Sequence, residues 1–170
     1  MDFFEVANER RSVRHFSDTP VPREDIEAIL KAGIAAPSAG NVQPWRFIVV
    51  ESEQARARLG SALEQGWVVA APVIIVVCVD PRPSRSRYGD RGAHLYSIQD
   101  SAAATQNMLL ATVARGLASC WVGAFDGGAI RTSLGIKKPI TPVAILPIGY
   151  SAQASGKQAR RPLAEVSVWT

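Results

Sequence analysis

Residues 71–79 read Ala-Pro-Val-Ile-Ile-Val-Val-Cys-Val, and Val73–Val79 is the longest unbroken apolar run in the chain. Proline cannot donate to a sheet ladder but is tolerated where a strand begins, so Pro72 predicts the start of a buried strand. The run is far shorter than the roughly 20 residues that a helix needs to span a bilayer. It therefore predicts the centre of a protein core and no membrane segment.

Helix and strand patterns alternate on both sides of this run. Upstream, Pro22–Ala35 has a proline and two acidic residues in its first turn and one apolar stripe, which predicts an amphipathic helix. Downstream, His94–Arg115 is apolar or small nearly all round in its middle, which predicts a buried helix ended by Gly116. Asp80–Gly92 is predicted to be the only long loop. Further helices are expected at 2–9, 53–65 and 126–134, and strands at 45–50, 119–124, 141–149 and 165–169.

This alternation predicts helices packed around one sheet, as an α/β or α+β sandwich. The chain has 170 residues, which suits one domain, and no internal repeat or linker divides it. We therefore expect a single domain over 1–170. The tail, about residues 151–170, is too polar to build its own core. It would be stable only if laid across another surface, such as a partner subunit.

The composition is that of an ordinary folded protein, with 47% hydrophobic and 20% charged residues. These proportions rule out a disordered or low-complexity chain. The two cysteines, Cys78 and Cys120, lie in apolar stretches, which is typical of reduced thiols in a cytosolic protein. The first five residues lack the basic region and the apolar region of a secretory signal peptide. Together these features predict a cytoplasmic location.

Basic residues gather at three places, within 10–15, within 82–91 and within 157–161, and the net charge is +4. Nucleic-acid binding favours a continuous basic helix or groove with interleaved aromatic residues. The clusters here are short and lie in separate segments, so we expect no nucleic-acid partner. A compact phosphate-bearing ligand suits them better, because guanidinium groups match the geometry of phosphate oxygens.

Most sequence fingerprints of catalysis are missing. No G-x-G-x-x-G follows a strand, no phosphate-binding G-x-x-x-x-G-K-[ST] occurs, and no G-x-S-x-G is present. His15 and His94 do not make a zinc site, so no metal is expected. Cys120 could be a nucleophile, but a small buried apolar residue is the simpler interpretation.

Three segments remain that could bind a ligand, each with a plain structural alternative. Arg10–Arg14 offers three arginines and a serine, although a basic helix end would also complement the helix dipole. Pro37–Trp45 supplies amide side chains that can read the edge of a planar heterocycle, or is only a turn before a strand. Ser119–Asp126 has small residues that permit close approach of a flat ligand, or is a strand-to-helix turn.

In this order, the segments resemble the nitroreductase-like FMN-dependent flavoprotein family, of which this would be a minimal member. The motifs that carry the resemblance are R-R-S-V-R-H-F at 10–16, A-P-S-A-G-N-V-Q-P-W at 36–45, A-P-V-I-I-V at 71–76, S-C-W-V-G-A-F at 119–125, L-G-I at 134–136, P-I-G-Y at 147–150 and R-R-P-L at 160–163. The resemblance implies an α+β fold, an α/β/α sandwich with a mixed central sheet. It also implies an intertwined homodimer with FMN at the subunit interface.

The resemblance further implies which residues bind FMN. Arg10, Ser12 and Arg14 would surround the phosphate and ribityl chain, with Arg11 near the pyrimidine end, and Arg160 and Arg161 would return to the phosphate. Gln65 would contact the isoalloxazine edge. The partner subunit would supply Pro37, Ser38, Ala39 and Asn41. One ring face would meet Trp121, Val122, Gly123 and Ala124, with the Gly123 N–H near flavin N5.

The activity implied is ping-pong transfer of hydride from NADH or NADPH, through flavin N5, to a small-molecule electron acceptor of nitroaromatic or quinone type. No catalytic side chain is expected, because the flavin carries the chemistry. Gly123 replaces an acidic residue found in some family members, so any role of that side chain is absent. Alternatives are reductive dehalogenation or enoate reduction on the same fold, and a flavin- or anion-binding module without turnover.

Overall fold

Strand β2 (Val73–Val79) lies inside the sheet and is buried along its whole length. In this computed structural model, which describes residues 1–170, β2 pairs antiparallel with β1 (Trp45–Val50) on one side and β4 (Thr141–Gly149) on the other. The short strand β3 (Ala118–Ser119) pairs antiparallel with β4, so the strand order is β1-β2-β4-β3. The predicted buried strand is confirmed.

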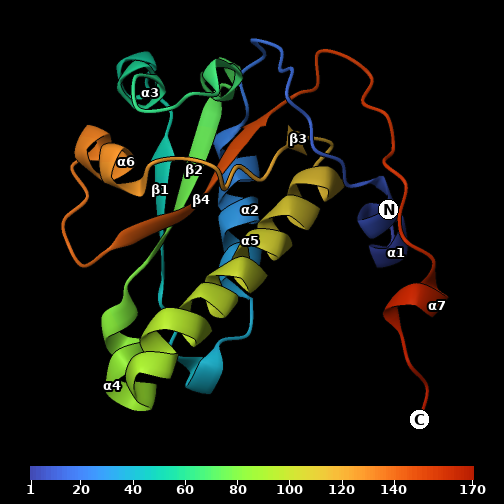
Figure 1. The fold of residues 1–170 in the computed structure, drawn as a ribbon. Coiled ribbons are helices and arrows are strands. Elements are labelled where there is room, and N and C mark those ends of the chain that lie inside the picture. The colour runs from blue at the N-terminus through green and yellow to red at the C-terminus, as the bar shows by residue number, and fades with distance from the viewer.

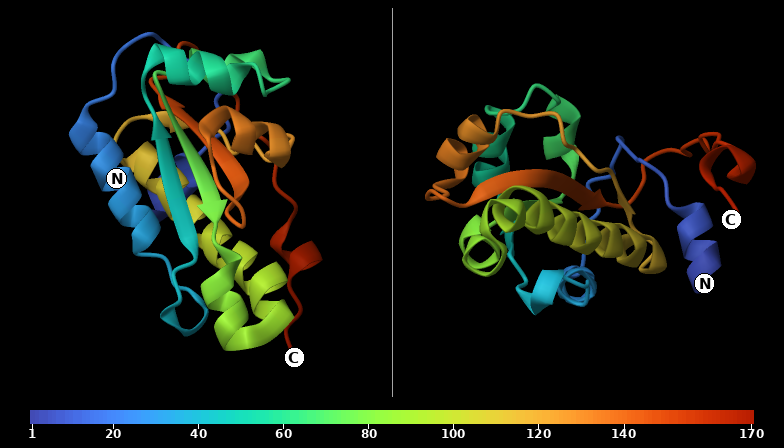
Figure 2. Two further views of the ribbon diagram at one scale, coloured as in Figure 1. Left: turned by 90° about the vertical axis from the view of Figure 1, so that its left-hand side faces the viewer. Right: turned by 60° about the horizontal axis from the view of Figure 1, so that its bottom comes forward.

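Helices cover both faces of this sheet (Figure 2). Helices α2 (Arg23–Ile34) and α5 (Ser97–Ala114) pack on one face, where Ile75 and Val77 of β2 join their core. The other face carries α3 (Glu53–Gly60), α6 (Gly127–Leu134) and a short 3₁₀ turn, η2 (Gly66–Ala70). Alternate residues of one strand thus serve two cores. The α+β class and the helix–sheet–helix layers are confirmed. The mixed sheet that the resemblance implied is not seen within one chain: all strand pairs are antiparallel, and the one parallel pairing is an isolated bridge between Ser12 and Ser119.

The stretch predicted as the only long loop, Asp80–Gly92, is instead mostly the helix α4 (Pro81–Arg91). The Asp80 carboxylate accepts the Arg82 N–H and caps the first turn, and Pro81 occupies an early helical position where no N–H is needed. These start signals outweigh a composition rich in proline, serine and glycine. Gly89, with φ of 62°, interrupts the helix before one wider turn, η3 (Gly92–Tyr96), continues into α5.

Three other predicted elements differ in type or in bounds. The expected edge strand at 165–169 is wrong: a short helix, α7 (Leu163–Val166), forms there, and Arg161 pairs with Glu165 across one turn. The expected strand at 119–124 is reduced to β3 and one bridge between Val122 and Ile145. The helix expected over 53–65 ends at Gly60, and the chain then enters η2. Local alternation does not create a strand where no sheet edge lies alongside.

The two ends of the chain run beside each other (Figure 1). The Ala152 N–H donates to the His15 carbonyl, and beyond it the tail passes α1 (Phe3–Glu9) and extends away from the sheet. Both segments leave large apolar side chains exposed: Phe3, Phe4, Leu163, Val166, Val168 and Trp169. None of the helices has the length and apolar character needed to cross a membrane.

Candidate functional site

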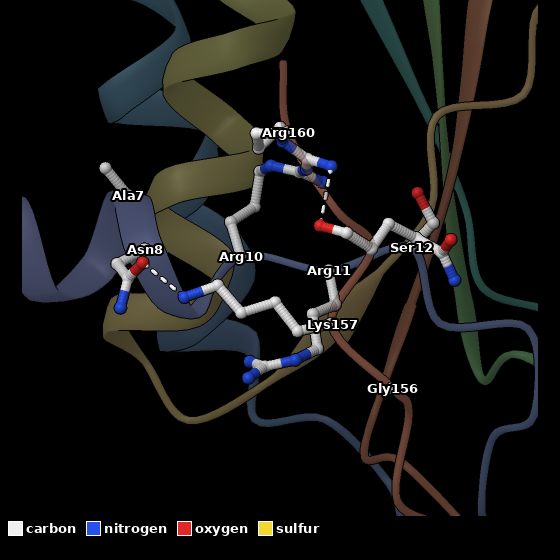
Figure 3. Close-up of a pocket in the computed structure, with 9 residues that line it drawn as sticks. Ala7, Asn8, Arg10, Arg11, Ser12, Gly156, Lys157 and Arg160 are labelled. Atoms are coloured by element: carbon white, nitrogen blue, oxygen red, sulfur yellow. Dashed lines mark hydrogen bonds between the residues drawn. The ribbon is translucent and has the colours of Figure 1, made fainter. Parts of the chain in front are cut away.

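A cavity of about 170 Å³ lies between the end of α1 and the returning tail (Figure 3). We call it the basic cavity. Most of its lining residues are polar or charged, and they come from two segments far apart in the sequence. They are Ala7, Asn8, Arg10, Arg11, Ser12, Gly156, Lys157, Gln158 and Arg160.

The backbone around the basic cavity is fixed by the end of a helix and the edge of the sheet. Arg10 caps the C-terminal end of α1, where its N–H donates to the Val6 carbonyl. Ser12 forms the parallel bridge to Ser119, and the Val13 N–H donates to the Ser119 carbonyl over 2.9 Å. The side chains of 10–12 are therefore presented from an ordered backbone.

The basic cavity has more positive than negative charge. Of its four cationic side chains, only Arg11 is paired with a carboxylate, that of Glu9 at 2.7 Å. The hydrogen bond and charge of Arg11 lower the pKa of Glu9. Lys157 donates to the amide oxygen of Asn8 over 2.5 Å, and Arg160 donates only to backbone carbonyls. Arg10, Lys157 and Arg160 thus remain free of carboxylates, and together they favour a bound anion.

A second group of predicted residues lies on the side of 10–14 that faces η2. The Gln65 side-chain amide donates to the Ala124 carbonyl over 3.0 Å, which joins Gln65 to the segment Trp121–Ala124. Arg14 lies over the ring of Trp67, with 5.8 Å from its guanidinium carbon to the ring centre. The Oε1 atom of Gln65 is buried without a hydrogen-bond partner. The structure therefore brings residues 10–14, Gln65 and 121–124 into one region.

The segment Pro37–Asn41 lies elsewhere, beside α4 and the start of α5 (Figure 1). Its backbone is tightly bent, because Gly40 and Asn41 both have φ of 56°. The Ala39 N–H donates to the buried Asp100 carboxylate over 3.0 Å, and the Gly40 carbonyl accepts from Arg87 over 2.7 Å. Within one chain, this segment and the basic cavity occupy opposite ends of α5.

Asp100, on α5, holds the bent segment Pro37–Asn41 through a hydrogen bond. Burial raises the pKa of its carboxyl group, and the hydrogen bond from Ala39 offsets part of that rise. One carboxylate oxygen accepts the Ala39 N–H, and the other is buried without a partner. The sequence offers no signal for this contact, because the two residues are 61 positions apart.

Two further details concern the tail. Arg161 does not line the basic cavity and pairs instead with Glu165 over 3.2 Å. Lys157 and Asn8, which were not among the predicted site residues, do line it and contact each other. The signal that could have indicated Lys157 is its presence in the same basic cluster as Arg160.

The sequence matches the model of the nitroreductase family over residues 7–70 and 60–150. The chain belongs to the nitroreductase family. One relative, a protein of Archaeoglobus fulgidus named for an inferred NADH dehydrogenase/NAD(P)H nitroreductase activity, is 40% identical over 146 residues. That alignment covers 83% of this chain and 80% of the relative. The expected oxidoreductase family is thus confirmed.

Solved nitroreductase structures share the whole fold. A nitroreductase family protein of Clostridium difficile has a TM-score of 0.89 and 30% identity, covering 99% of this chain and 98% of that one. A structure from Exiguobacterium sibiricum, described as a nitroreductase in complex with FMN, has a TM-score of 0.90 and 24% identity. It covers 100% of this chain and 98% of that one. The fold of this chain is therefore the nitroreductase fold.

Proposed function

We propose that this protein is an FMN-dependent oxidoreductase that passes electrons from NADH or NADPH to nitroaromatic or quinone-type acceptors. The observation that carries the proposal is the basic cavity, where Arg10, Lys157 and Arg160 have no carboxylate partner. A phosphate ester such as that of FMN supplies the missing negative charge. The names of the relatives, which give NADH or NAD(P)H and nitroreductase, support the same activity.

The chemistry of the side chains fits FMN. Arg10, Ser12 and Arg160 would hold the phosphate, with Lys157 beside them. Arg11 has a buried Nε atom without a partner, and Gln65 has a buried Oε1 atom without one. Unpaired buried polar atoms are rare in folded proteins and are expected where a ligand completes the hydrogen bonds. Gln65 and residues 121–124 would therefore receive the polar edge and one face of the ring.

A second copy of the chain would complete the site. The segment with Pro37, Ser38, Ala39 and Asn41 lies at the opposite end of α5 from the basic cavity of its own chain (Figure 1), and it would instead line the ligand held by the partner subunit. The exposed apolar side chains of α1 and of the tail supply a surface for such a homodimer, with residues 151–170 laid across the partner. We also propose that the chain forms a single domain over 1–170. A cytoplasmic location is part of the same proposal and agrees with both cysteines being free.

The protein's own contribution to catalysis is binding and orientation. FMN, when bound, would supply the redox chemistry that moves hydride from a reduced nicotinamide to an electron-poor acceptor. The segment 121–124 would lie against one face of the ring, with the Val122 N–H already bonded to the Ile145 carbonyl, and the arginines would add positive charge beside the cofactor. A Cβ atom at Gly123 would meet only the Trp121 indole, at 3.8 Å, so no side chain crowds this part of the site. No acid or base from the protein is required.

The first test is the visible absorption spectrum of the purified protein after FMN is added and free flavin is removed. Retained flavin absorption, followed by oxidation of NADPH or NADH when a quinone or nitroarene is present, supports the proposed activity. Flavin binding without turnover would favour a flavin-binding module. Turnover confined to halogenated or enoate acceptors would favour those same-fold activities. A protein that takes up no FMN contradicts the proposal.

A further inference from the structure

Helix α4 carries four arginines, and its ion pairs divide them into two kinds. Arg82 pairs with Asp80 over 2.7 Å, and Arg85 pairs with Asp90. These two carboxylates are the only ones on or capping α4. Arg87 and Arg91 therefore have no carboxylate partner, and both side chains lie on the surface. This part of the molecule has two free positive charges outside the basic cavity.

Arg87 and Arg91 are nevertheless held in place, by aromatic rings. The guanidinium carbon of Arg87 lies 5.6 Å from the centre of the Tyr88 ring, and that of Arg91 lies 5.5 Å from the Tyr96 ring. The two rings pack edge to face with their centres 5.4 Å apart. Arg91 also donates to the Tyr96 hydroxyl over 3.1 Å. The pair of arginines is thus ordered before any ligand binds, which lowers the entropic cost of binding.

This pair is joined to the bent segment Pro37–Asn41. Arg87 donates to the Gly40 carbonyl over 2.7 Å. A Cβ atom at Gly40 would lie 2.3 Å from the Tyr88 hydroxyl oxygen and 2.6 Å from the Arg87 guanidinium carbon. A side chain at Gly40 would displace the ends of the Tyr88 and Arg87 side chains, and the φ of 56° favours glycine. The free arginines therefore lie directly beside residues that would line the flavin of the partner subunit.

We propose that Arg87 and Arg91 bind the phosphate groups of the nicotinamide dinucleotide donor, an inference that rests on the proposed function. The nicotinamide must stack on the flavin, so its pyrophosphate extends outward from the ring. Arginines at the rim of the site match those oxygens in charge and geometry.

The test compares donors with and without phosphate groups in the FMN-loaded protein. The donors are NADPH, NADH and 1-benzyl-1,4-dihydronicotinamide, a reduced nicotinamide that carries no phosphate. The variants are Arg87→Gln, Arg91→Gln and the double variant, with Arg85→Gln as the matched control because Arg85 is already paired with Asp90. Arg91→Gln leaves the Gly40 contact of Arg87 intact, so it separates phosphate binding from positioning of the bent segment.

For Arg91→Gln, we expect kcat/KM for the dinucleotide, divided by that for the phosphate-free donor, to fall about tenfold. The double variant should fall further, and Arg85→Gln should keep the ratio of the unmodified protein. A fall with both NADH and NADPH assigns the arginines to the pyrophosphate, whereas a fall with NADPH alone assigns them to the 2′-phosphate. A second measurement is calorimetric binding of NADP⁺ to the oxidised, FMN-loaded protein, where Kd should rise by about the same factor.

An unchanged ratio in the double variant would overturn the inference, as would an equal loss with all three donors, which indicates positioning alone. Unchanged NADP⁺ affinity would also overturn it. These outcomes are distinct from failure of the proposed function, in which the unmodified protein would retain no FMN or oxidise no donor. Flavin content measured for each variant keeps the two apart.

Discussion

The molecule has two concentrations of unpaired positive charge, and they differ in shape. In the basic cavity, Arg10, Lys157 and Arg160 surround a concave space closed by the returning tail. On α4, Arg87 and Arg91 lie open on the surface, each against a tyrosine ring. Cations from two segments that converge on a cavity can hold an anion through several contacts at once, whereas two cations on an open helix surface offer fewer contacts.

This difference indicates two kinds of ligand. The cavity suits a group that remains bound, such as the phosphate of FMN, and the α4 surface suits a substrate that enters and leaves. Within one chain the two regions lie at opposite ends of α5 (Figure 1), and in the proposed homodimer they would meet in one site. We therefore expect one site that is shared between two copies of the chain.

The largest expected effect is on cofactor retention. Arg10→Gln combined with Arg160→Gln should raise the FMN dissociation constant at least about a hundredfold, because each charge-assisted hydrogen bond contributes about 1.5–3 kcal/mol. Flavin fluorescence titration measures this constant. The control, Arg58→Gln on the exposed face of α3, should bind FMN as the unmodified protein does. Equal affinity in the double variant and the control would mean that the cavity does not hold the phosphate.

Gly40→Ala should disturb the contact between α4 and the bent segment Pro37–Asn41. The substitution places a Cβ atom against Tyr88 and Arg87 and forces a residue with a side chain to adopt φ of 56°. We expect a loss of about 1–3 kcal/mol in unfolding free energy, together with a higher KM for the dinucleotide donor. Thermal or denaturant unfolding measures the stability change. Gly66→Ala is the matched control, because nothing lies within 4 Å of the added atom there. Equal stability in the two variants would contradict the tight contact at Gly40.

Ionic strength should change ligand affinity differently at the two regions, without any mutation. Exposed charges are screened strongly once the Debye length falls from about 14 Å to a few Å, but FMN would also be held by contacts of its ring with Gln65 and 121–124, which salt does not screen. Raising ionic strength from about 0.05 M to about 0.5 M should raise the KM for NADPH several-fold and leave most FMN bound. Steady-state kinetics, with flavin content measured at each salt concentration, provides the comparison. Parallel weakening of both would mean that charge alone holds FMN and that its ring adds no salt-insensitive contact.

The smallest expected effect concerns Asp100, below the bent segment. Burial raises the pKa of this carboxyl, so the folded state holds its proton more tightly than the unfolded chain does. The stability that this provides is complete at low pH and is lost as pH rises through the raised pKa. Asp100→Asn keeps an oxygen for the Ala39 N–H but cannot ionise. Its melting temperature relative to the unmodified protein should therefore increase between about pH 4 and about pH 7. A melting-temperature difference that does not change with pH would show that ionisation of Asp100 does not destabilise the folded protein.

Features set by local chemistry could be predicted from the sequence. The uniform apolar run after Pro72 predicts β2 correctly, and the small-residue middle of His94–Arg115 predicts the buried helix α5. The order of the motifs indicates the nitroreductase family, which the family match confirms. Helix α4 was missed because its composition favours a loop, although Asp80 and Pro81 carry the signal for a helix start.

Features set by contacts between distant residues could not be predicted from single-sequence patterns. Lys157 reaches Asn8 across 149 positions, and Gln65 reaches Ala124 across 59. The contact of Arg87 with Gly40 is of the same kind, and it is what attaches α4 to the bent segment. Such pairings depend on how the layers pack, so they appear only when the fold is known.

The measurement that tests the shared site most directly is native mass spectrometry of the FMN-loaded protein. We expect one dominant species with two chains and two FMN molecules, because the proposed site takes 10–14 and Gln65 from one chain and 37–41 from its partner. A single chain that retains FMN would contradict this, since the basic cavity and residues 65 and 121–124 would then suffice without the bent segment of a partner.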